Sequence, residues 1–264
     1  MEVSFFGSRV QALSMDQVDS YLEEALDQGK KTRIYTPNTE IVMEAKDKAW
    51  IRDLLNSGDL RLADGIGLVM GAKINKIPLE ERVTGFDVSI HLLQIAQREG
   101  YKVYFLGAKK GIAQRAAQEV EEDYPGLVVV GSHHGYYEKS SLDQDLTQDE
   151  EEIIEEIQRL QADIVFVGLG FPVQEVFIHK ASQRLGRGVW IGNGGVLDIL
   201  AKEQKRAPEI FIRLHLEWFY RLIKNPSRWK RQLAIPKFLI QVITKKNAVK
   251  IVREDFNENE SKGN

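Results

Sequence analysis

The amino-acid sequence predicts an α/β protein in which a parallel sheet carries helices on both faces and a small basic helical appendage follows at the C-terminal end. Short apolar runs alternate with segments of helical period, which is the pattern of a doubly wound sheet. Four of the apolar runs end in glycine, and from about residue 205 the composition becomes basic and aromatic.

Five apolar runs have the length and composition of buried strands. They are RIYTPN (33–38), YKVYFLGA (101–108), LVVVGS (127–132), DIVFVGLG (163–170) and VWIGNGG (189–195). Apolar residues recur with helical period over 41–55, 88–99 and 150–161. Ligands of open parallel sheets bind outside the carboxyl ends of the strands, so we expect a binding site at the glycine-rich ends of these runs.

The bulk composition limits the class of protein. The chain has 264 residues, 43% of them hydrophobic, which is enough for one large α/β domain with a sizeable core. It has no cysteine, which excludes a disulfide framework and a cysteine nucleophile and fits a cytoplasmic location. The sequence shows neither a signal-peptide pattern nor an apolar run of about 18 residues that predicts a membrane-spanning helix.

The net charge of −3 conceals a strong asymmetry. Residues 205–253 hold thirteen Lys and Arg against two Asp and Glu, a balance of +11, whereas residues 1–204 carry −11. We therefore expect a core domain over 1–204, a basic appendage over 205–253 and a disordered tail over 254–264. Because the predicted sheet motifs all end by Asp198, we also expect the core domain to fold without the appendage.

The appendage predicts an anionic partner. Its cations are interleaved with aromatic and aliphatic residues, as in helices that lie on a membrane surface. The same cations are suited to a pyrophosphate group. No helix-turn-helix, zinc or RNA-recognition pattern accompanies them, so an anionic membrane surface or a diphosphate is favoured over nucleic acid.

Glycine-rich turns follow three of the predicted strands. Glycine allows a phosphate group to approach the backbone, and the N-terminus of the next helix favours an anion. The alternative is that these turns only allow close packing of helix on sheet. The full G-x-G-x-x-G spacing is missing, so a dinucleotide site is not supported. The candidate ligand contacts are Gly107, Gly168, Gly170, Gln174, Asn193, Gly194, Gly195 and Asp198.

Two further motifs place polar side chains at predicted turns. In ADGIG (63–67), Asp64 either caps the next helix or acts as a general base in a glycine-lined pocket. In YTPNTE (35–40), Thr36, Asn38 and Thr39 either cap the helix from Ile41 or contact a sugar, and both roles fit different residues.

The sequence offers no convincing metal site. DQD (143–145) resembles the D-x-D motif of metal-dependent sugar transferases, but it lies in an acidic polar stretch that we interpret as a loop and first helical turn. His133 and His134 are adjacent, which is not a zinc-ligand spacing, so a structural role or a place at the substrate's edge is favoured.

Taken together, these motifs resemble the WecG/TagA/CpsF family of glycosyltransferases. The resemblance rests on TPN (36–38), ADGIG (63–67), RVTGFD (82–87), FLGAKKG (105–111), HGYY (134–137), GLGFPVQE (168–175), GNGGVLD (192–198), KRAP (205–208) and LEWFYRLIKNPSRWKRQ (216–232). It implies a Rossmann-like catalytic domain, an appendage that closes over the active site, and inverting transfer without a metal or other cofactor. The typical family reaction moves N-acetylmannosamine from its UDP form to undecaprenyl-diphospho-N-acetylglucosamine in a β-1,4 linkage, for wall teichoic acid.

The resemblance also implies roles for individual residues. Asp64 matches the general base for the acceptor hydroxyl, and Thr36 and Arg82 match further catalytic residues. Substrate contacts are implied for Asn38, Gln174 and Asp198, the last of these with the ribose. A substrate contact is also implied for Arg206, and positive charge facing the diphosphate for Arg221, Arg228 and Arg231.

The sequence departs from the family pattern at Val173, where lysine is usual, at Leu197, where phenylalanine is usual, and at Lys202, where glycine is usual. These departures leave the donor sugar open, with UDP-glucose and UDP-N-acetylmannosaminuronic acid as alternatives. A non-catalytic, membrane-associated nucleotide-sugar binding protein and a nucleic-acid-binding protein are the alternatives from other classes. The expected setting is the inner face of a bacterial membrane, and the sequence leaves homo-oligomer formation open.

Overall fold

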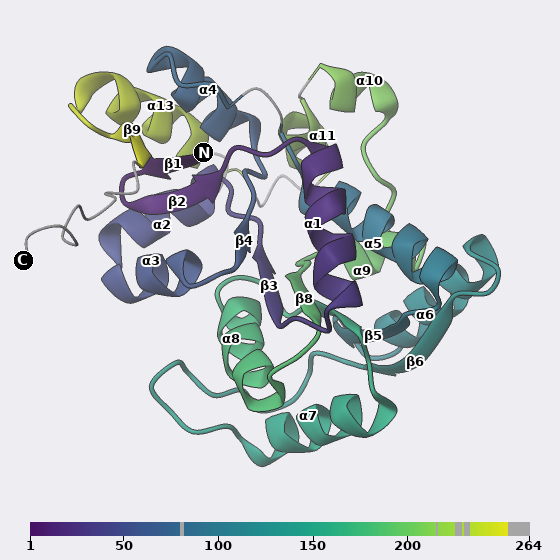
Figure 1. Cartoon of the computed structure of the whole chain (residues 1–264). Coiled ribbons are helices and arrows are strands. Elements are labelled where there is room, and N and C mark those ends of the chain that lie inside the picture. Colours follow the sequence, from purple (N-terminus) through teal and green to yellow (C-terminus); the bar gives the residue numbers. More distant parts are fainter. Residues whose placement is uncertain (80–81, 215, 225–228, 230–232, 253–264) are drawn as a thin grey trace, which may run out of the picture.

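The computed structural model describes residues 1–79, 82–214, 216–224, 229 and 233–252. Its main feature is a six-stranded sheet in the order β4-β3-β8-β7-β5-β6 (Figure 1). The strands are β3 (Thr32–Tyr35), β4 (Leu60–Arg61), β5 (Lys102–Gly107), β6 (Val128–His133), β7 (Ile164–Gly168) and β8 (Val189–Gly192). Every pairing in this sheet is parallel, which confirms the predicted α/β class.

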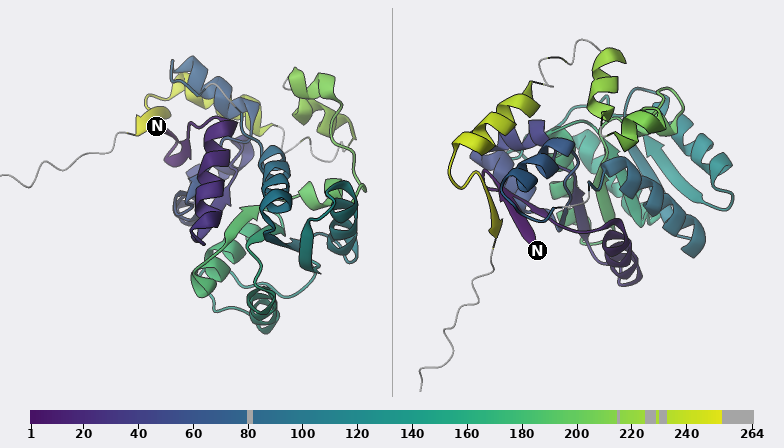
Figure 2. Two further views of the ribbon diagram at one scale, coloured as in Figure 1. Left: turned by 45° about the vertical axis from the view of Figure 1, so that its right-hand side comes forward. Right: turned by 90° about the horizontal axis from the view of Figure 1, so that it is seen from above.

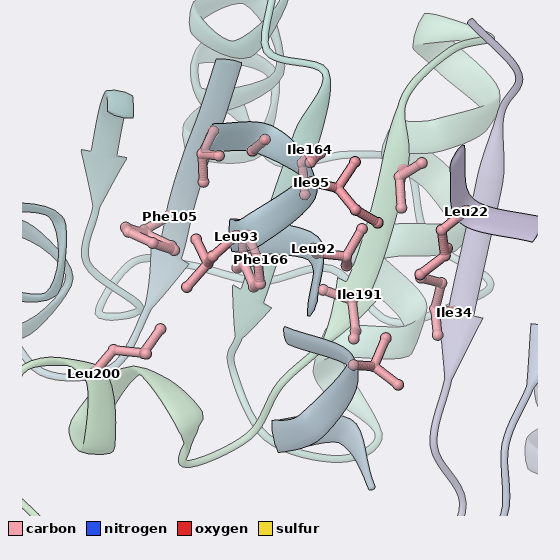
Figure 3. Packing of buried hydrophobic residues seen from close by; sticks show 14 of the residues in the cluster. Leu22, Ile34, Leu92, Leu93, Ile95, Phe105, Ile164, Phe166, Ile191 and Leu200 are labelled. Atoms are coloured by element: carbon pink, nitrogen blue, oxygen red, sulfur yellow. The ribbon is translucent and has the colours of Figure 1, made fainter. Parts of the chain in front are cut away.

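Helices cover both faces of the parallel sheet, as predicted. One face packs against α1 (Met15–Asp27), α5 (Gly85–Glu99), α6 (Ile112–Asp123) and α9 (Val196–Leu200). Figure 3 shows this layer, in which Phe105, Ile164 and Phe166 point toward Leu92 and Leu93. The other face packs against α3 (Ala49–Asn56), α7 (Gln148–Leu160) and α8 (Val173–Leu185).

The predicted helix over 41–55 is two helices in the structure. α2 (Thr39–Asp47) ends and α3 begins at Lys48, whose backbone is extended with φ −125° and ψ 104°. Val42 of α2 belongs to a core that also holds residues of a second sheet, whereas Ala45 of α2 and Ile51 and Leu55 of α3 pack on the parallel sheet.

The second sheet joins the two ends of the chain and was not predicted. β1 (Glu2–Phe5) pairs antiparallel with β2 (Ser8–Gln11) on one side and with β9 (Val249–Val252) on the other. The preceding helix α13 (Ala234–Thr244) lies against α4 (Ile66–Ile74), and Figure 2 shows both helices beside the N-terminus. These residues form a third hydrophobic core, separate from the two that line the parallel sheet.

This third core contains side chains from both sides of the expected boundary at residue 205, and whether residues 1–204 fold without the appendage stays a prediction. Phe238 and Val242 of α13 are 0% and 3% exposed among residues of β1, α2 and α4. Removal from residue 205 onward would uncover that apolar surface. Within the appendage, α10 (Glu209–Arg213) and α11 (Glu217–Lys224) precede α13. The division at residues 204 and 205 stays a prediction, and the tail over 254–264 lies outside the described residues.

Candidate active site

Most of the predicted site residues lie where strands of the parallel sheet end. Because the strands are parallel, the turns after β3, β4, β5, β7 and β8 lie along one edge of the sheet. Thr36 directly follows β3, Asp64 follows β4, and the three glycine turns follow β5, β7 and β8. The structure therefore brings these motifs to the expected edge, while their chemical roles stay predictions.

The Asp64 carboxylate contacts the N-terminal end of α5. Its Oδ2 atom accepts a hydrogen bond at 3.2 Å from the backbone N–H of Gly85, the first residue of that helix. The Asp64 N–H donates to the Pro37 carbonyl at 3.1 Å, which joins the turns after β3 and β4. The alternative that Asp64 caps the helix after it is wrong, since α4 begins after Gly65 without a side-chain cap.

Thr36 lies against the same glycine. A Cβ atom on Gly85 would stand 3.0 Å from Thr36 Oγ1, so only a residue without a side chain fits there easily. A carboxylate, a hydroxyl and the first turn of a 15-residue helix thus meet in one place. The backbone donors of such a turn favour a negative charge, which suits this corner to a carboxylate that accepts a proton from an incoming hydroxyl.

Asn38 has a structural role in this arrangement. Its side-chain oxygen accepts a hydrogen bond from Ile41 N at 3.1 Å and caps α2. Its Cβ atom also lies close to Gly65, where an added Cβ would stand 3.4 Å away. Of the two roles left open by the sequence, capping therefore belongs to Asn38, and its contact with substrate stays a prediction.

Arg82 faces a carboxylate of the appendage. Its Nη2 atom donates to Glu217 Oε2 at 3.3 Å, and the two side chains are only 12% and 9% exposed. Glu217 opens α11, so this ion pair fixes the appendage to the loop before α5. Sequence reasoning missed Glu217, although it is one of only two acids among the thirteen cations of residues 205–253.

Arg206 also binds the first turn of α5. Its Nη2 atom donates to Asp87 Oδ1 at 2.6 Å, and its guanidinium lies 4.2 Å from the centre of the Phe86 ring. Asp87 is itself held by the capping residue Thr84, whose hydroxyl donates to Asp87 Oδ2 at 2.7 Å. Arg206 therefore adds positive charge to the helix end that Asp64 contacts.

Gln174 connects two glycine turns. Its Oε1 atom accepts hydrogen bonds from Gly170 N at 3.1 Å and Gly194 N at 2.9 Å, and its Nε2 atom donates to Glu175 Oε1 at 3.0 Å. The side chain is 5% exposed. Since both ends of the amide are engaged, the structure gives Gln174 the task of holding the turns after β7 and β8.

The turns after β5 and β7 are in direct contact. Gly107 has φ +134°, and a Cβ atom on it would stand 2.3 Å from the Gly168 carbonyl oxygen. No other residue fits at this position without moving the neighbouring strand end. The adjacent Ala108 N–H donates to that same carbonyl at 3.0 Å, so a hydrogen bond joins the two turns.

Asn193 is buried at the end of β8. Its side-chain oxygen accepts a hydrogen bond from Ser89 Oγ of α5 at 3.0 Å. Its Nδ2 atom is buried and has no hydrogen-bond partner in the described part of the chain. Ser89 was not selected from the sequence, and its place inside an apolar helical period gives no signal of this contact.

The remaining basic candidates are only partly described. Arg228 and Arg231 lie outside the described residues, and Arg221 lies on α11, whose backbone alone is described there. Asp198 lies on α9, directly after the Gly194–Gly195 turn. Their contacts with a diphosphate and a ribose stay predictions.

The histidine pair lies at the carboxyl end of β6, next to the turn after β5, where Gly135 N–H donates to the Ala108 carbonyl at 2.9 Å. His133 and His134 line a cavity of about 260 Å³ together with Tyr137 and carboxylates of α7. Asp143 accepts a hydrogen bond from Ser141 Oγ at 2.6 Å in a loop. Among the described residues, no group of three or more His, Asp or Glu side chains is placed to hold a metal ion. Independence from metal is a prediction that this observation does not test.

The structure shows the surroundings of two residues that depart from the family pattern, Lys202 and Leu197. Lys202 takes a left-handed backbone conformation with φ +56°, which explains why glycine is usual there. Its amine binds Glu119 at 2.7 Å and Asp123 at 3.0 Å on α6. Leu197 is fully buried, with its Cδ1 atom 3.0 Å from where a Gly168 Cβ would stand.

Glu175 is a buried carboxylic acid beside Gln174. It is 2% exposed, and burial raises its pKa to about 7 even though it accepts hydrogen bonds from Gln174 and from its own backbone. Tyr35 of β3 lies beside it, and its hydroxyl donates to the Glu175 backbone carbonyl at 3.3 Å. Burial raises the pKa of Tyr35 as well, so this phenol stays neutral.

We expect Glu175→Gln to change how stability depends on pH. The raised pKa means that the folded protein holds this proton more tightly than the unfolded chain, so wild-type stability falls as pH rises from about 4.5 to 7. Glutamine removes the titration. Relative to wild type, the variant should gain about 2 kcal/mol in free energy of unfolding between pH 5 and 8. Urea unfolding at both pH values measures this gain, and parallel curves for the two proteins would contradict it.

Comparison with known proteins identifies the family. The model of the Glycosyl transferase WecG/TagA/CpsF family matches residues 3–251. The chain belongs to this family. It is therefore a glycosyltransferase, and the resemblance in its sequence motifs is confirmed.

Similar proteins occur in Bacillus spizizenii, Bacillus subtilis and Staphylococcus aureus. The chain is 40% identical over 230 residues to a protein of Bacillus spizizenii, covering 87% of this chain and 86% of the relative. It is 39% identical to a protein of Bacillus subtilis, with 84% of each chain covered, and 32% identical to one of Staphylococcus aureus, with 82% of each covered. All three are named N-acetylglucosaminyldiphosphoundecaprenol N-acetyl-beta-D-mannosaminyltransferase.

The names of these three relatives specify an acceptor built on undecaprenol. Within the described ranges, no helix combines the length and the apolar character needed to cross a bilayer.

Proposed function

We propose that this glycosyltransferase moves N-acetylmannosamine from UDP-N-acetylmannosamine to N-acetylglucosaminyl-diphospho-undecaprenol. The transfer forms a β-1,4 linkage with inversion, in the synthesis of wall teichoic acid or a related surface polysaccharide. The observation that carries the proposal is the 40% identity, over 87% of the chain, to a relative named for this transfer. A different UDP-sugar donor is the alternative that the departures at Val173, Leu197 and Lys202 leave open.

The proposed chemistry assigns one task to each part of the site. Asp64, held by the N–H of Gly85, takes the proton from the acceptor hydroxyl as that oxygen attacks the anomeric carbon. The bond from that carbon to UDP breaks, and negative charge grows on the leaving diphosphate. Arg82 precedes α5 and Arg206 contacts its first turn, so cations stand near the same helix end to meet this charge.

A donor screen tests the proposed donor. We expect UDP release with UDP-N-acetylmannosamine and a short-chain lipid-diphospho-N-acetylglucosamine acceptor, and at least tenfold lower kcat/KM with UDP-glucose. A site that hydrogen-bonds one sugar leaves its own buried polar groups unpaired when another sugar binds. Such a site discriminates between the two sugars by well over tenfold. A preference for UDP-glucose would replace the donor assignment, and the absence of turnover with every donor would contradict the proposed reaction.

Chelation tests the proposed independence from metal. We expect turnover to survive excess EDTA within about twofold, because cations of the protein would replace the metal at the diphosphate. Turnover is measured before and after chelation, with Mg²⁺ and Mn²⁺ added back. Loss of turnover that either metal restores would make Asp143 and Asp145 candidates for metal binding again.

We also propose that the enzyme acts at the inner face of a bacterial membrane as a peripheral protein. The support is a set of large apolar side chains, each at least 40% exposed, on and between the helices of the basic appendage. They are Ile210, Leu214, Phe219, Ile223, Trp229, Leu233, Ile240 and Ile243. Apolar and basic side chains together favour contact with anionic lipid, and such contact brings the enzyme to a lipid-linked acceptor.

A further inference from the structure

The amide of Gln174 can hold its two turns in only one orientation. Its oxygen faces two backbone donors, Gly170 N and Gly194 N, at 3.1 and 2.9 Å. If the amide rotated by 180°, its NH₂ group would face those two N–H groups and both hydrogen bonds would be lost. The two hydrogen bonds to the turns therefore depend on the contact that holds the amide in this orientation.

The Glu175 side chain holds the Gln174 amide in this orientation. Its Oε1 atom accepts from Gln174 Nε2 at 3.0 Å, so the nitrogen end of the amide is held away from the glycines. The pair also fills the space at the end of β8 tightly. A Cβ atom on Gly192 would stand 2.8 Å from Gln174 Nε2 and 3.3 Å from Glu175 Oε1.

Burying the Glu175 carboxyl group costs free energy that packing alone does not require. Glu175 is 2% exposed, and its Oε2 atom has no hydrogen-bond partner in the described part of the chain. Burying a polar group without a partner costs about 1–3 kcal/mol, which an apolar side chain of similar size avoids. The acceptor that faces Gln174 is what an apolar side chain cannot provide.

We propose that Glu175 is a positioning residue for sugar transfer, acting through Gln174 on the glycine turns that follow β7 and β8. The inference rests on the proposed function, since it takes these turns to bind the nucleotide part of the donor. The turn after β7 in turn contacts the turn after β5 through Gly168 and Gly107. A misplaced amide would therefore disturb three strand ends along the edge that carries Asp64.

The test compares variants with and without the acceptor. Glu175→Gln keeps an acceptor for Gln174 and should keep kcat within about threefold. Glu175→Met has similar size without the acceptor and should lower kcat about 10- to 100-fold, because small misplacements in a site have effects of that order. It should also weaken the affinity for UDP, measured by calorimetry. Tyr35→Phe is the control for stability, since it removes the hydrogen bond to the Glu175 backbone carbonyl and leaves the Glu175 carboxyl group and Gln174 unchanged.

A double variant tests whether Glu175 acts through Gln174. If it does, Glu175→Met should cause little further loss in a Gln174→Met protein, whereas additive losses would overturn the proposal. Equal kcat for the methionine and glutamine variants would overturn it too. Should Glu175→Met not fold, the swap Gln174→Glu with Glu175→Gln decides, because it restores the pair in reverse and must retain turnover within about tenfold. UDP affinity depends on no particular sugar, so it separates failure of this inference from failure of the donor assignment.

Discussion

Asp64→Asn should lower kcat by about 10²- to 10⁴-fold while the affinity for UDP changes less than about threefold. A positioned general base contributes a factor of this size, and asparagine cannot accept the proton. The asparagine oxygen can still accept the hydrogen bond from Gly85 N, so the turn between β4 and α4 should keep its shape. The loss would therefore fall on the chemical step and not on the fold.

Asp143→Asn is the matched control for this experiment. Asp143 lies in a loop where it accepts a hydrogen bond from Ser141, and the same change of carboxylate to amide there should leave kcat unchanged. Turnover is measured as UDP release at saturating donor and acceptor, and UDP binding by calorimetry. If Asp64→Asn turns over like wild type, Asp64 serves only to hold the start of α5, and the base lies elsewhere.

The parallel sheet could be predicted because its strands carry their own signal. β7 and β8 are apolar along their whole length and β5 is apolar after Lys102, as expected for strands covered on both faces, and all three end in glycine. β4 has only two residues and shows no period. In the sheet of β1, β2 and β9, residue 2 pairs with residue 252. The sequence of either short segment does not predict which strand it pairs with.

The site could be predicted as a set of turns but not as a network. Glycine and carboxylate motifs mark the strand ends, which is why Asp64, Thr36 and Gly107 could be selected. The partner of a side chain depends on the folded arrangement. Arg82 and its partner Glu217 are 135 residues apart in the sequence, and Gln174 contacts a turn 20 residues away. Local pattern carries no information over such separations.

Phe238→Ala should lower the free energy of unfolding by about 3–5 kcal/mol, the usual range for removing a buried phenylalanine. The ring is fully buried between the two ends of the chain. It lies 6.0 Å from the Phe5 ring and 5.8 Å from the Phe6 ring, centre to centre. It also packs against Gly71 of α4, where an added Cβ atom would stand 2.7 Å from the ring.

Ile240→Ala is the matched control, because Ile240 lies on the same helix and is 61% exposed. This change should alter stability by less than about 0.5 kcal/mol. Urea unfolding of both variants measures the difference. If residues 1–204 form a core that does not need α13, the two variants should have the same free energy of unfolding. Removal of residues 205–264 should then leave a stable protein. Because Phe238 packs against β1 and α4, and α4 begins two residues after Asp64, we expect its loss to destabilise the segment next to Asp64 as well.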